Sequence, residues 1–204
     1  MIKNIVFDLG NVIIKFDPLG YILSLGYEGE FAKKVTKAVY SHPIWQDLDK
    51  GKYDNYADAI PDFLAQNKEE LVTEEIAQRV FKGDWRKLFS LMEDSLQYLY
   101  ELKEKGYNIY ILSNFGKEGF EYVREQFSFF DDVHGMVISA YVKMIKPEAQ
   151  IYEHLLKTFN LKANETVFLD DLPQNIQAAK DMGIHGILFT NLEEAKQKLD
   201  NLTT

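Results

Sequence analysis

Five short apolar runs most restrict what this chain can fold into. They cover residues 5–7, 109–112, 136–138, 166–169 and 186–189. A strand with one face in water alternates apolar and polar residues, whereas a strand that is covered on both faces does not. Because the runs lack this alternation, they predict the strands of a parallel sheet with helices on both faces.

Segments with helical spacing of apolar residues lie between these runs. The predicted helices cover residues 95–105, 148–159, 173–182 and 192–202. In the first helix, Leu96, Leu99 and Tyr100 form an apolar stripe, and Gly106 follows as a helix stop. In the last helix, Leu202 is among the residues expected to face inward. Strands that alternate with helices predict an α/β fold with a doubly wound, Rossmann-like parallel sheet as its core.

The stretch 17–85 breaks this pattern, because it contains no run of the buried-strand kind. Helical spacing dominates it, over residues 31–40, 56–66 and 74–81. We therefore predict a small all-helical cap over residues 17–85, inserted after the first strand. The remaining residues, 1–16 and 86–204, form the predicted catalytic core.

Charge and composition exclude several classes of function. The net charge of −9 argues against a general nucleic-acid or anionic-membrane surface, since both need clustered Lys and Arg. The chain has no cysteine, which rules out disulfides and thiol catalysis. The apolar run before Asp8 is too short for a signal peptide, and no later run approaches the ~18 residues of a membrane span. We therefore expect a cytoplasmic protein without nucleic-acid or membrane partners.

Polar residues close the predicted strands and suggest where the site lies. They are Asp8, Gly10 and Asn11 after the first run, Ser113 and Asn114 after the second, Lys146 before a predicted helix, and Asp170 and Asp171 after the fourth run. Ligands of open α/β sheets bind outside the carboxyl ends of the strands, so these groups are expected to converge. Carboxylates, a hydroxyl, an amide and a cation together suit a metal-bound phosphate.

Each of these elements has a simpler explanation when it is taken alone. Asp8 can cap a turn, Ser113 and Asn114 can begin a helix, and Lys146 can be a solvated loop lysine. The adjacent pair Asp170-Asp171 is harder to explain in this way, because two neighbouring carboxylates repel each other and need a cation or strong hydrogen bonds. The four elements in this order are much stronger evidence than any one of them.

The order of these motifs resembles the haloacid dehalogenase-like hydrolase superfamily. Phe-Asp-Leu-Gly-Asn-Val is similar to its first motif, Leu-Ser-Asn to its second, Lys-Pro-Glu to its third and Phe-Leu-Asp-Asp to its fourth. The resemblance spans nearly the whole chain. Within the superfamily, a bacterial subgroup of small sugar-phosphate phosphatases that includes α-glucose-1-phosphatase is similar in three segments. They are Asp-Leu-Gly-Asn-Val, Lys-Pro-Glu-Ala-Gln-Ile-Tyr and Asp-Asp-x-x-x-Asn-Ile.

The resemblance implies a covalent mechanism and a magnesium site. Asp8 would be the nucleophile and would form an aspartyl-phosphate that water later hydrolyses. Mg²⁺ would be held by Asp8, Asp171 and the main-chain carbonyl of Gly10. Lys146 would act as a catalytic cation that offsets the repulsion between the attacking carboxylate and the phosphate dianion.

The resemblance also implies the groups that support this chemistry. Ser113, Asn114 and Lys146 would bind the phosphate. Asp170 would support the metal shell, and Asn175 would order the loop that carries the acid pair. The expected substrate is a small phosphorylated metabolite, with a sugar phosphate as the specific expectation.

Gly10 departs from the family pattern. Most family phosphatases carry a second aspartate at this position, where it protonates the leaving group and then activates water. Glycine cannot transfer a proton, and general acid–base catalysis contributes ~10²–10⁴-fold. Asp17 and His42 are conceivable acids from the cap, although Asp17 precedes a proline and can simply start a helix, and His42 can be a turn residue. We expect that no single cap residue replaces the missing acid.

Three functions are therefore compared. The first is a magnesium-dependent phosphatase, which we favour. The second is a 2-haloacid dehalogenase that uses Asp8 to attack carbon, a reaction that needs neither a metal nor a second aspartate. The third is a non-catalytic module that binds a phosphorylated metabolite. The cap would lie over the crevice as a lid. A turn similar to Leu48-Asp49-Lys50-Gly51 recurs in the subgroup that the motifs resemble, so this turn and Trp45 are candidates to face the substrate, although Trp45 can equally be buried.

Overall fold

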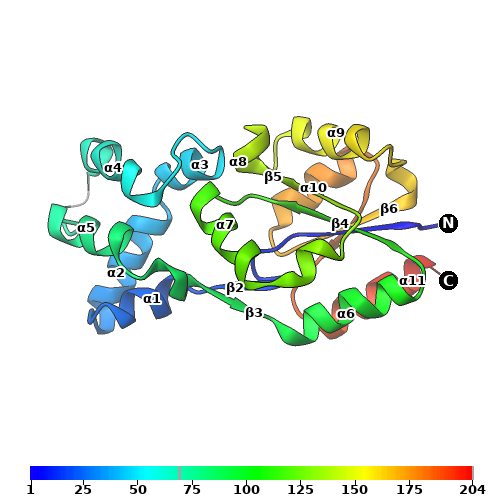
Figure 1. The fold of residues 1–204 in the computed structure, drawn as a ribbon, viewed down its shortest axis with the longest axis horizontal. Helices are drawn as coiled ribbons and strands as arrows, with labels where there is room; N and C mark the ends of the chain where they lie inside the picture. The colour runs from blue at the N-terminus through cyan, green and yellow to red at the C-terminus, as the bar shows by residue number, and fades with distance from the viewer. Residues whose placement is uncertain (69, 204) are drawn as a thin grey trace.

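The computed structural model describes residues 1–68 and 70–203. Its core is a five-stranded sheet in the order β5-β4-β1-β6-β7, in which every neighbouring pair is parallel (Figure 1). The strands are β1 (Asn4–Phe7), β4 (Asn108–Ser113), β5 (Gly135–Ile138), β6 (Thr166–Asp170) and β7 (His185–Leu188). All five predicted strands are confirmed, with ends that agree to within one residue.

The order of the strands places a crevice at the middle of the sheet. The chain begins at β1, adds β4 and β5 on one side, and then crosses over to add β6 and β7 on the other. In such sheets ligands bind where the strand order reverses, outside the carboxyl ends. The N–H of Asp8 donates a hydrogen bond to the Leu169 carbonyl at 2.9 Å, which continues the pairing of β1 with β6 up to this crevice.

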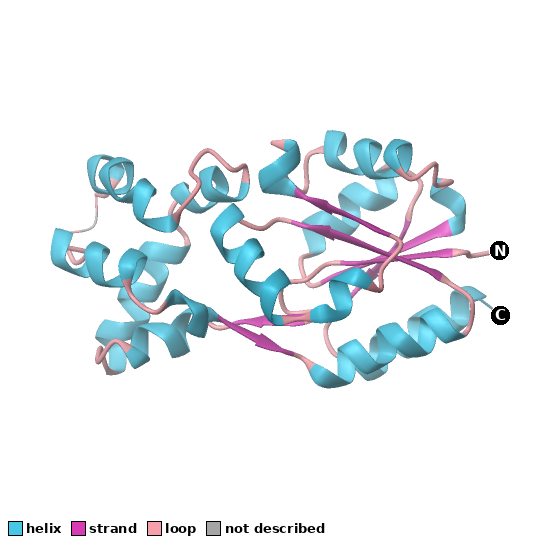
Figure 2. Cartoon of the chain, viewed as in Figure 1, coloured by secondary structure: helices cyan, strands magenta, loops and turns pink. Residues whose placement is uncertain are grey.

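Helices cover both faces of the sheet, as the unbroken apolar strands predict (Figure 2). One face packs against α6 (Glu93–Glu104), α7 (Lys117–Gln126) and α11 (Leu192–Thr203), and the other against α9 (Ala149–Thr158) and α10 (Pro173–Asp181). Successive residues of β1 alternate between these two cores. Ile5 and Phe7 point to the first and Val6 to the second, and all three side chains are buried. The α/β fold with a doubly wound sheet is thus confirmed.

A group of short helices forms the cap between two additional strands. It contains α1 (Pro18–Ser24), α2 (Gly29–Tyr40), α3 (Ile44–Asp49), η1 (Tyr56–Ala59), α4 (Ile60–Gln66), α5 (Glu74–Lys82) and η2 (Trp85–Leu88). These helices share an apolar core of their own, which includes Val35, Phe63 and Phe81. In Figure 1 this group lies to one side of the sheet, with its helix α3 next to α8 (Ser139–Val142) of the core.

Both connections between cap and core are strands that the sequence analysis did not predict. β2 (Ile14–Phe16) leads into the cap and β3 (Phe89–Leu91) leads out of it, and the two pair as antiparallel strands. The cap therefore follows β2 and not β1 directly. The predicted domain boundaries at residues 16/17 and 85/86 stay predictions.

The predicted helices differ from the structure in two details. The buried residues of α6 are Ser95, Tyr98, Leu99 and Leu102, whereas Leu96 and Tyr100 of the predicted stripe are only half-buried against the same core. The small Ser95 is buried, so the buried face is rotated from the one that hydrophobicity alone indicates. Leu202 is 41% exposed and does not face inward, whereas Ala195 and Leu199 of α11 are buried and Leu192 packs against the same core. In the two described ranges, no helix is long and apolar enough to cross a membrane.

Candidate active site

A cavity of about 280 Å³ lies between the carboxyl ends of the core strands and the cap. We call it the active-site cavity. From the core it is lined by Asp8, Gly10, Asn11, Ile14, Phe16, Phe89, Asn114, Phe115, Gly116, Lys146, Asp171, Leu172 and Asn175, and from the cap by Trp45, Asp49 and Tyr56. Of the residues singled out at the strand ends, all except Ser113 and Asp170 therefore line this one cavity.

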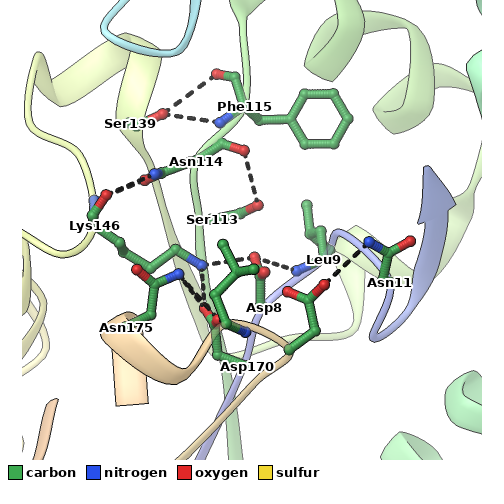
Figure 3. Close-up of polar contacts among 12 residues, drawn as sticks. Asp8, Leu9, Asn11, Ser113, Asn114, Phe115, Ser139, Lys146, Asp170 and Asn175 are labelled. Atoms are coloured by element: carbon green, nitrogen blue, oxygen red, sulfur yellow. Dashed lines mark hydrogen bonds and ion pairs between the residues drawn. The ribbon is translucent and has the colours of Figure 1, made fainter. Parts of the chain in front are cut away.

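Lys146 lies between two carboxylates at the base of this cavity (Figure 3). Its Nζ is 2.8 Å from Asp8 Oδ1 and 2.6 Å from Asp170 Oδ2, and only 1% of the Lys146 side chain is exposed. The N–H of Leu9 also donates to Asp8 Oδ1, at 2.7 Å. Burial raises the pKa of Asp8, and the Lys146 ammonium opposes that rise. Burial lowers the pKa of Lys146, but the two carboxylates outweigh it, so the lysine stays charged.

Asp170 is completely buried and is held by hydrogen bonds from three sides. Besides Lys146, it accepts hydrogen bonds from Asn175 Nδ2 at 2.9 and 3.0 Å and from the N–H of Leu172 at 2.8 Å. The Tyr152 hydroxyl donates to the Asn175 carbonyl at 2.9 Å, which ties the start of α10 to α9. Asp170 and Asn175 thus hold Lys146 and the loop after β6 in place.

Three carboxylates around the cavity form a donor set that fits a divalent cation. One oxygen each from Asp8, Asp170 and Asp171 lies within 4.8 Å of the others. Oxygen-only donors of this kind suit Mg²⁺. Because Asp170 is already engaged by Lys146 and Asn175, the carboxylates with free ligand positions are Asp8 and Asp171. The residues present therefore fit the predicted metal site, and Gly10 lines the same cavity.

Asn114 and Ser113 occupy the end of β4, next to Lys146. The Asn114 side chain accepts a hydrogen bond from the Lys146 N–H at 2.8 Å and donates one to the Lys146 carbonyl at 2.9 Å. Its amide therefore fixes the backbone that carries the lysine. Ser113 is buried, and its hydroxyl reaches the Asn114 carbonyl only at 3.5 Å. Phosphate binding by these two residues stays a prediction.

Asn11 has a role that the sequence analysis missed. Its backbone adopts a left-handed conformation with φ of 54°, which asparagine tolerates better than most residues. The side chain donates to Asp171 Oδ2 at 3.1 Å and accepts from the N–H of Phe16 at 3.2 Å. Burial raises the pKa of Asp171, while this hydrogen bond lowers it. Asn11 thus connects a candidate metal ligand to the strand that leads into the cap. The sequence signal for this role is an asparagine that follows a glycine at the end of a strand.

Trp45 is both part of the cap core and part of the cavity wall. Its Nε1 donates to the Val39 carbonyl at 2.7 Å, and its ring stacks on Tyr40 with ring centroids 4.7 Å apart. The side chain is half-buried and also lines the active-site cavity. The ring is therefore partly buried in the cap and partly exposed to the cavity, and its contact with a substrate stays a prediction.

The two cap residues named as conceivable acids do not line the active-site cavity. Asp17 accepts a hydrogen bond from the Gly20 N–H at 2.9 Å and pairs with Lys15 at 3.0 Å, so it begins α1. The Gly20 hydrogen bond, with help from Lys15, lowers the pKa of Asp17. The Nδ1 of His42 accepts a hydrogen bond from the N–H of Ile44 at 3.1 Å. Both have the structural roles that their positions before a proline suggest.

A comparison with protein families decides the classification. The model of the haloacid dehalogenase-like hydrolase family matches residues 2–183. The chain belongs to this family. The predicted superfamily is thus confirmed, and the chain is a hydrolase by membership of it.

Two relatives of this hydrolase match over nearly their whole length. A sesquiterpene phosphatase, astK, from Aspergillus oryzae is 27% identical over 192 residues, which cover 93% of this chain and 90% of the relative. A D-ribitol-5-phosphate phosphatase from Bacteroides thetaiotaomicron is 28% identical over 213 residues, which cover 98% and 97%. Phosphatases are therefore among the relatives of this hydrolase, and the second acts on a sugar-alcohol phosphate.

A solved structure supports the fold of this hydrolase. A haloacid dehalogenase-family enzyme from Bacteroides thetaiotaomicron, in a complex with magnesium and inorganic phosphate, superposes with a TM-score of 0.68. The two sequences are 22% identical, and the match covers 92% of this chain and 94% of the other. The likeness shows that the two proteins share a fold.

Proposed function

We propose that this hydrolase is a magnesium-dependent phosphatase that cleaves a small phosphorylated metabolite through an aspartyl-phosphate on Asp8. The observation that carries the proposal is the arrangement of Asp8, Lys146 and Asp171 around one cavity of about 280 Å³. It combines a carboxylate nucleophile, a buried cation and oxygen donors for a metal, which are the groups that phosphoryl transfer to a carboxylate needs.

The geometry around Asp8 favours attack by one particular oxygen. Oδ1 accepts a hydrogen bond from the Leu9 N–H and forms the ion pair with Lys146. Among the described residues, none donates to Oδ2, so this oxygen is available to attack phosphorus. Bound Mg²⁺ would offset the charge of the phosphate dianion next to the carboxylates. Lys146 contributes positive charge from the other side, and Asp170 fixes the position of its ammonium.

A sugar phosphate is the first candidate for the substrate. The relative that acts on D-ribitol-5-phosphate supports it, as does the likeness of the motifs to the sugar-phosphate phosphatase subgroup. The volume of the cavity suits a small leaving group. The exposed part of the Trp45 ring offers an aromatic surface for the apolar side of a sugar.

An apolar phosphate ester is the second candidate, because the cavity wall beyond the phosphate site is mostly apolar. Ile14, Phe16, Phe89 and Phe115 join Trp45 in lining it. The sesquiterpene phosphatase among the relatives acts on an ester of this kind. Burial of apolar surface would then supply much of the binding free energy.

The other two functions fit the site less well. A 2-haloacid carries a carboxylate, which Asp8, Asp170 and Asp171 would repel. A module that only binds its ligand does not need a carboxylate oxygen that is free to attack phosphorus. The dehalogenase is tested by chloride release from a 2-haloacid, and the binding module by phosphate binding without turnover.

The first experiment measures phosphate release from sugar phosphates, prenyl and alkyl phosphates, nucleotides and an aryl phosphate. Each is assayed with Mg²⁺, with EDTA and with the Asp8→Asn variant. We expect release to need Mg²⁺ and to disappear in Asp8→Asn, while Asp131→Asn, an exposed aspartate away from the cavity, keeps full activity. Phosphate release by Asp8→Asn at the wild-type rate, or no release from any ester by the wild type, would refute the proposal.

A further inference from the structure

The proposed function leaves the departing alkoxide without a proton donor. The cavity lining at Gly10 has no side chain, although an acid is needed there for an ester with a poor leaving group. Asp17 caps α1, His42 accepts a hydrogen bond from the Ile44 N–H, and neither lines the cavity. A replacement must be a titratable group that lines the same cavity and is held in a fixed position relative to Asp8.

Asp49 meets the first of these conditions. It is the last residue of α3, it is half-buried, and it lines the active-site cavity together with Asp8 and Lys146. In the part of the chain that the structure describes, no group forms a hydrogen bond with its carboxylate. The charged or titratable groups that face it are Asp8 and Lys146 from the core and Tyr56 from η1.

The turn that carries Asp49 is fixed to the core by hydrogen bonds. The Ser139 hydroxyl donates to the Asp49 carbonyl at 2.6 Å and accepts from the N–H of Phe115 at 2.9 Å. Lys143 Nζ, also from the core, donates to the carbonyl of Gly51. The backbone of Asp49 is therefore anchored to Ser139 of α8, which is itself hydrogen-bonded to the loop that follows β4.

Two further features hold the same turn. An ion pair of 2.7 Å joins Lys50 of the cap to Glu148 of the core. Gly51 has a φ of 64°, and a Cβ atom at this position would collide with the Ala140 carbonyl. The backbone of the turn therefore lies too close to α8 for any residue except glycine at position 51. These contacts hold Asp49 in a fixed position relative to the core that carries Asp8, which is the second condition.

We propose that Asp49, reaching in from the cap, is the general acid and base of this phosphatase and takes the place of the aspartate that is absent at Gly10. The inference rests on the proposed function and identifies a catalytic residue of the same site. It replaces the expectation that no single cap residue supplies the acid. Burial raises the pKa of Asp49 to about 7, with Lys146 opposing and Asp8 adding to the rise, so both protonation states are accessible near neutral pH.

The protons balance over the two steps. In the first, an Asp8 oxygen forms a bond to phosphorus, the bond from phosphorus to the leaving oxygen breaks, and that oxygen takes its electron pair and the proton of Asp49. In the second, water attacks phosphorus and gives a proton to the Asp49 carboxylate. The bond between phosphorus and Asp8 breaks with its electron pair on Asp8, which releases hydrogen phosphate and restores both aspartates.

The test compares Asp49→Asn on two substrates that differ in leaving group. An alkyl phosphate needs protonation of its leaving oxygen, whereas 4-nitrophenyl phosphate does not. We expect kcat/KM for the alkyl ester to fall by ~10²–10⁴-fold and that for the aryl ester to fall less than about tenfold, since general acid catalysis of its departure is not required. The matched control is Asp47→Asn, because Asp47 lies on the same helix but pairs with Lys52 at 3.1 Å and does not line the cavity.

A second variant separates a catalytic role from a structural one. A Cβ atom at Gly10 meets no atom within 4 Å, so there is open space for an aspartate. We expect Gly10→Asp to restore the alkyl activity of the Asp49→Asn background by at least about tenfold. We also expect the wild-type kcat/KM for the alkyl ester to fall as the pH rises through about 7, because Asp49 then loses its proton, and the Asp49→Asn variant to lack this decline.

The outcomes of these experiments decide separately whether Asp49 is the acid and whether Asp8 is the nucleophile. Equal losses on both substrates with an unchanged pH profile, or unchanged alkyl activity in Asp49→Asn, overturn the role of Asp49. If Asp8→Asn abolishes turnover of the aryl ester in the same experiments, the proposed function survives that result. Turnover that does not depend on Asp8 instead overturns the proposed function, and the role of Asp49 with it.

Discussion

Lys146 shows how strongly one residue can depend on its neighbours. Its ammonium is buried between Asp8 and Asp170, and the backbone beside it is held by Asn114. A buried charge is tolerated only when it is paired and hydrogen-bonded. In this site the same contacts keep the lysine charged and place it beside the nucleophile, so stability and chemistry rest on one set of interactions.

Replacing this lysine is expected to reduce both properties. Lys146→Met leaves two buried carboxylates without their cation, and we expect the free energy of unfolding to fall by about 3–5 kcal/mol, with loss of turnover. Urea denaturation measures the first effect. Lys162→Met is the control, because the Lys162 side chain is 72% exposed beside Glu165, and such surface pairs contribute about 0–1 kcal/mol. Equal stability of the two variants would contradict this account of the site.

Asp49 should also affect stability in a manner that depends on pH. Its pKa is about 7 in the folded protein against 3.8 for the ordinary side chain, so the folded state binds more protons than the unfolded state between these values. Stability of the wild type therefore falls as the pH rises through this window. We expect Asp49→Asn to have the same melting temperature as the wild type near pH 4 and a higher one above pH 7.

That stability measurement is made in EDTA and does not depend on turnover. Asp47→Asn should show no such trend. A difference between wild type and Asp49→Asn that stays constant with pH would mean that burial, together with the charges of Lys146 and Asp8, leaves the pKa of Asp49 unshifted.

The sequence predicted the site residues on the strands better than those in the cap. Asp8, Asp170 and Asp171 follow buried apolar runs, and a parallel sheet must bring such strand ends together. The resemblance points to the turn 48–51 as a candidate to face the substrate, but it assigns no role to Asp49, and a six-residue helix such as α3 gives too little periodicity to say which of its carboxylates faces the core. The side chain of Asn114 could not be assigned either, since its partner lies 32 residues away in the chain.

At the scale of elements, the turn after α3 matters most for the site. Gly51→Ala would combine a left-handed backbone with a collision at the Ala140 carbonyl. We expect the turn to move away from α8 and kcat for the alkyl ester to fall by up to ~10²-fold, since a shift of about 1 Å in a catalytic group can have that effect. Steady-state kinetics on the alkyl and aryl esters measure it.

Gly26→Ala provides the matched control for this prediction. Gly26 also has a positive φ, of 87°, but a Cβ atom there meets no atom within 4 Å. Both variants carry the cost of a left-handed alanine, roughly 1–2 kcal/mol, but only Gly51→Ala should lose activity. Loss of activity in both would assign the effect to general destabilisation of the cap.

The short strands β2 and β3 mark what periodicity cannot detect. Each has three residues, which is too few for an alternating pattern to appear. Their identity depends on pairing between segments on opposite sides of the cap, such as Phe16 with Phe89. The buried strands of the main sheet carried their own signal as unbroken apolar runs, whereas β2 and β3 are defined by a partner that is distant in the chain.

At the scale of the whole molecule, the active-site cavity lies between the apolar core of the cap and the two apolar cores that flank the sheet. The net charge of −9 is unfavourable for a phosphorylated substrate, and the proposed metal and Lys146 act against it locally. Contacts between cap and core also include the ion pair of Lys117 with Asp54 at 2.7 Å and a hydrogen bond of 2.7 Å from the Tyr56 N–H to Glu118. The predicted location and the absence of nucleic-acid partners stay predictions.

The paired strands β2 and β3 have a consequence for how such an enzyme can diversify. Because the chain enters and leaves the cap through two neighbouring strands, the whole insertion is attached through this one pair of strands. Recombination at these strands could exchange one cap for another without disturbing the sheet that carries Asp8. If Asp49 acts as proposed, however, the proton donor is inherited with the cap, so a new cap must bring its own acid or leave the core limited to esters that depart unaided.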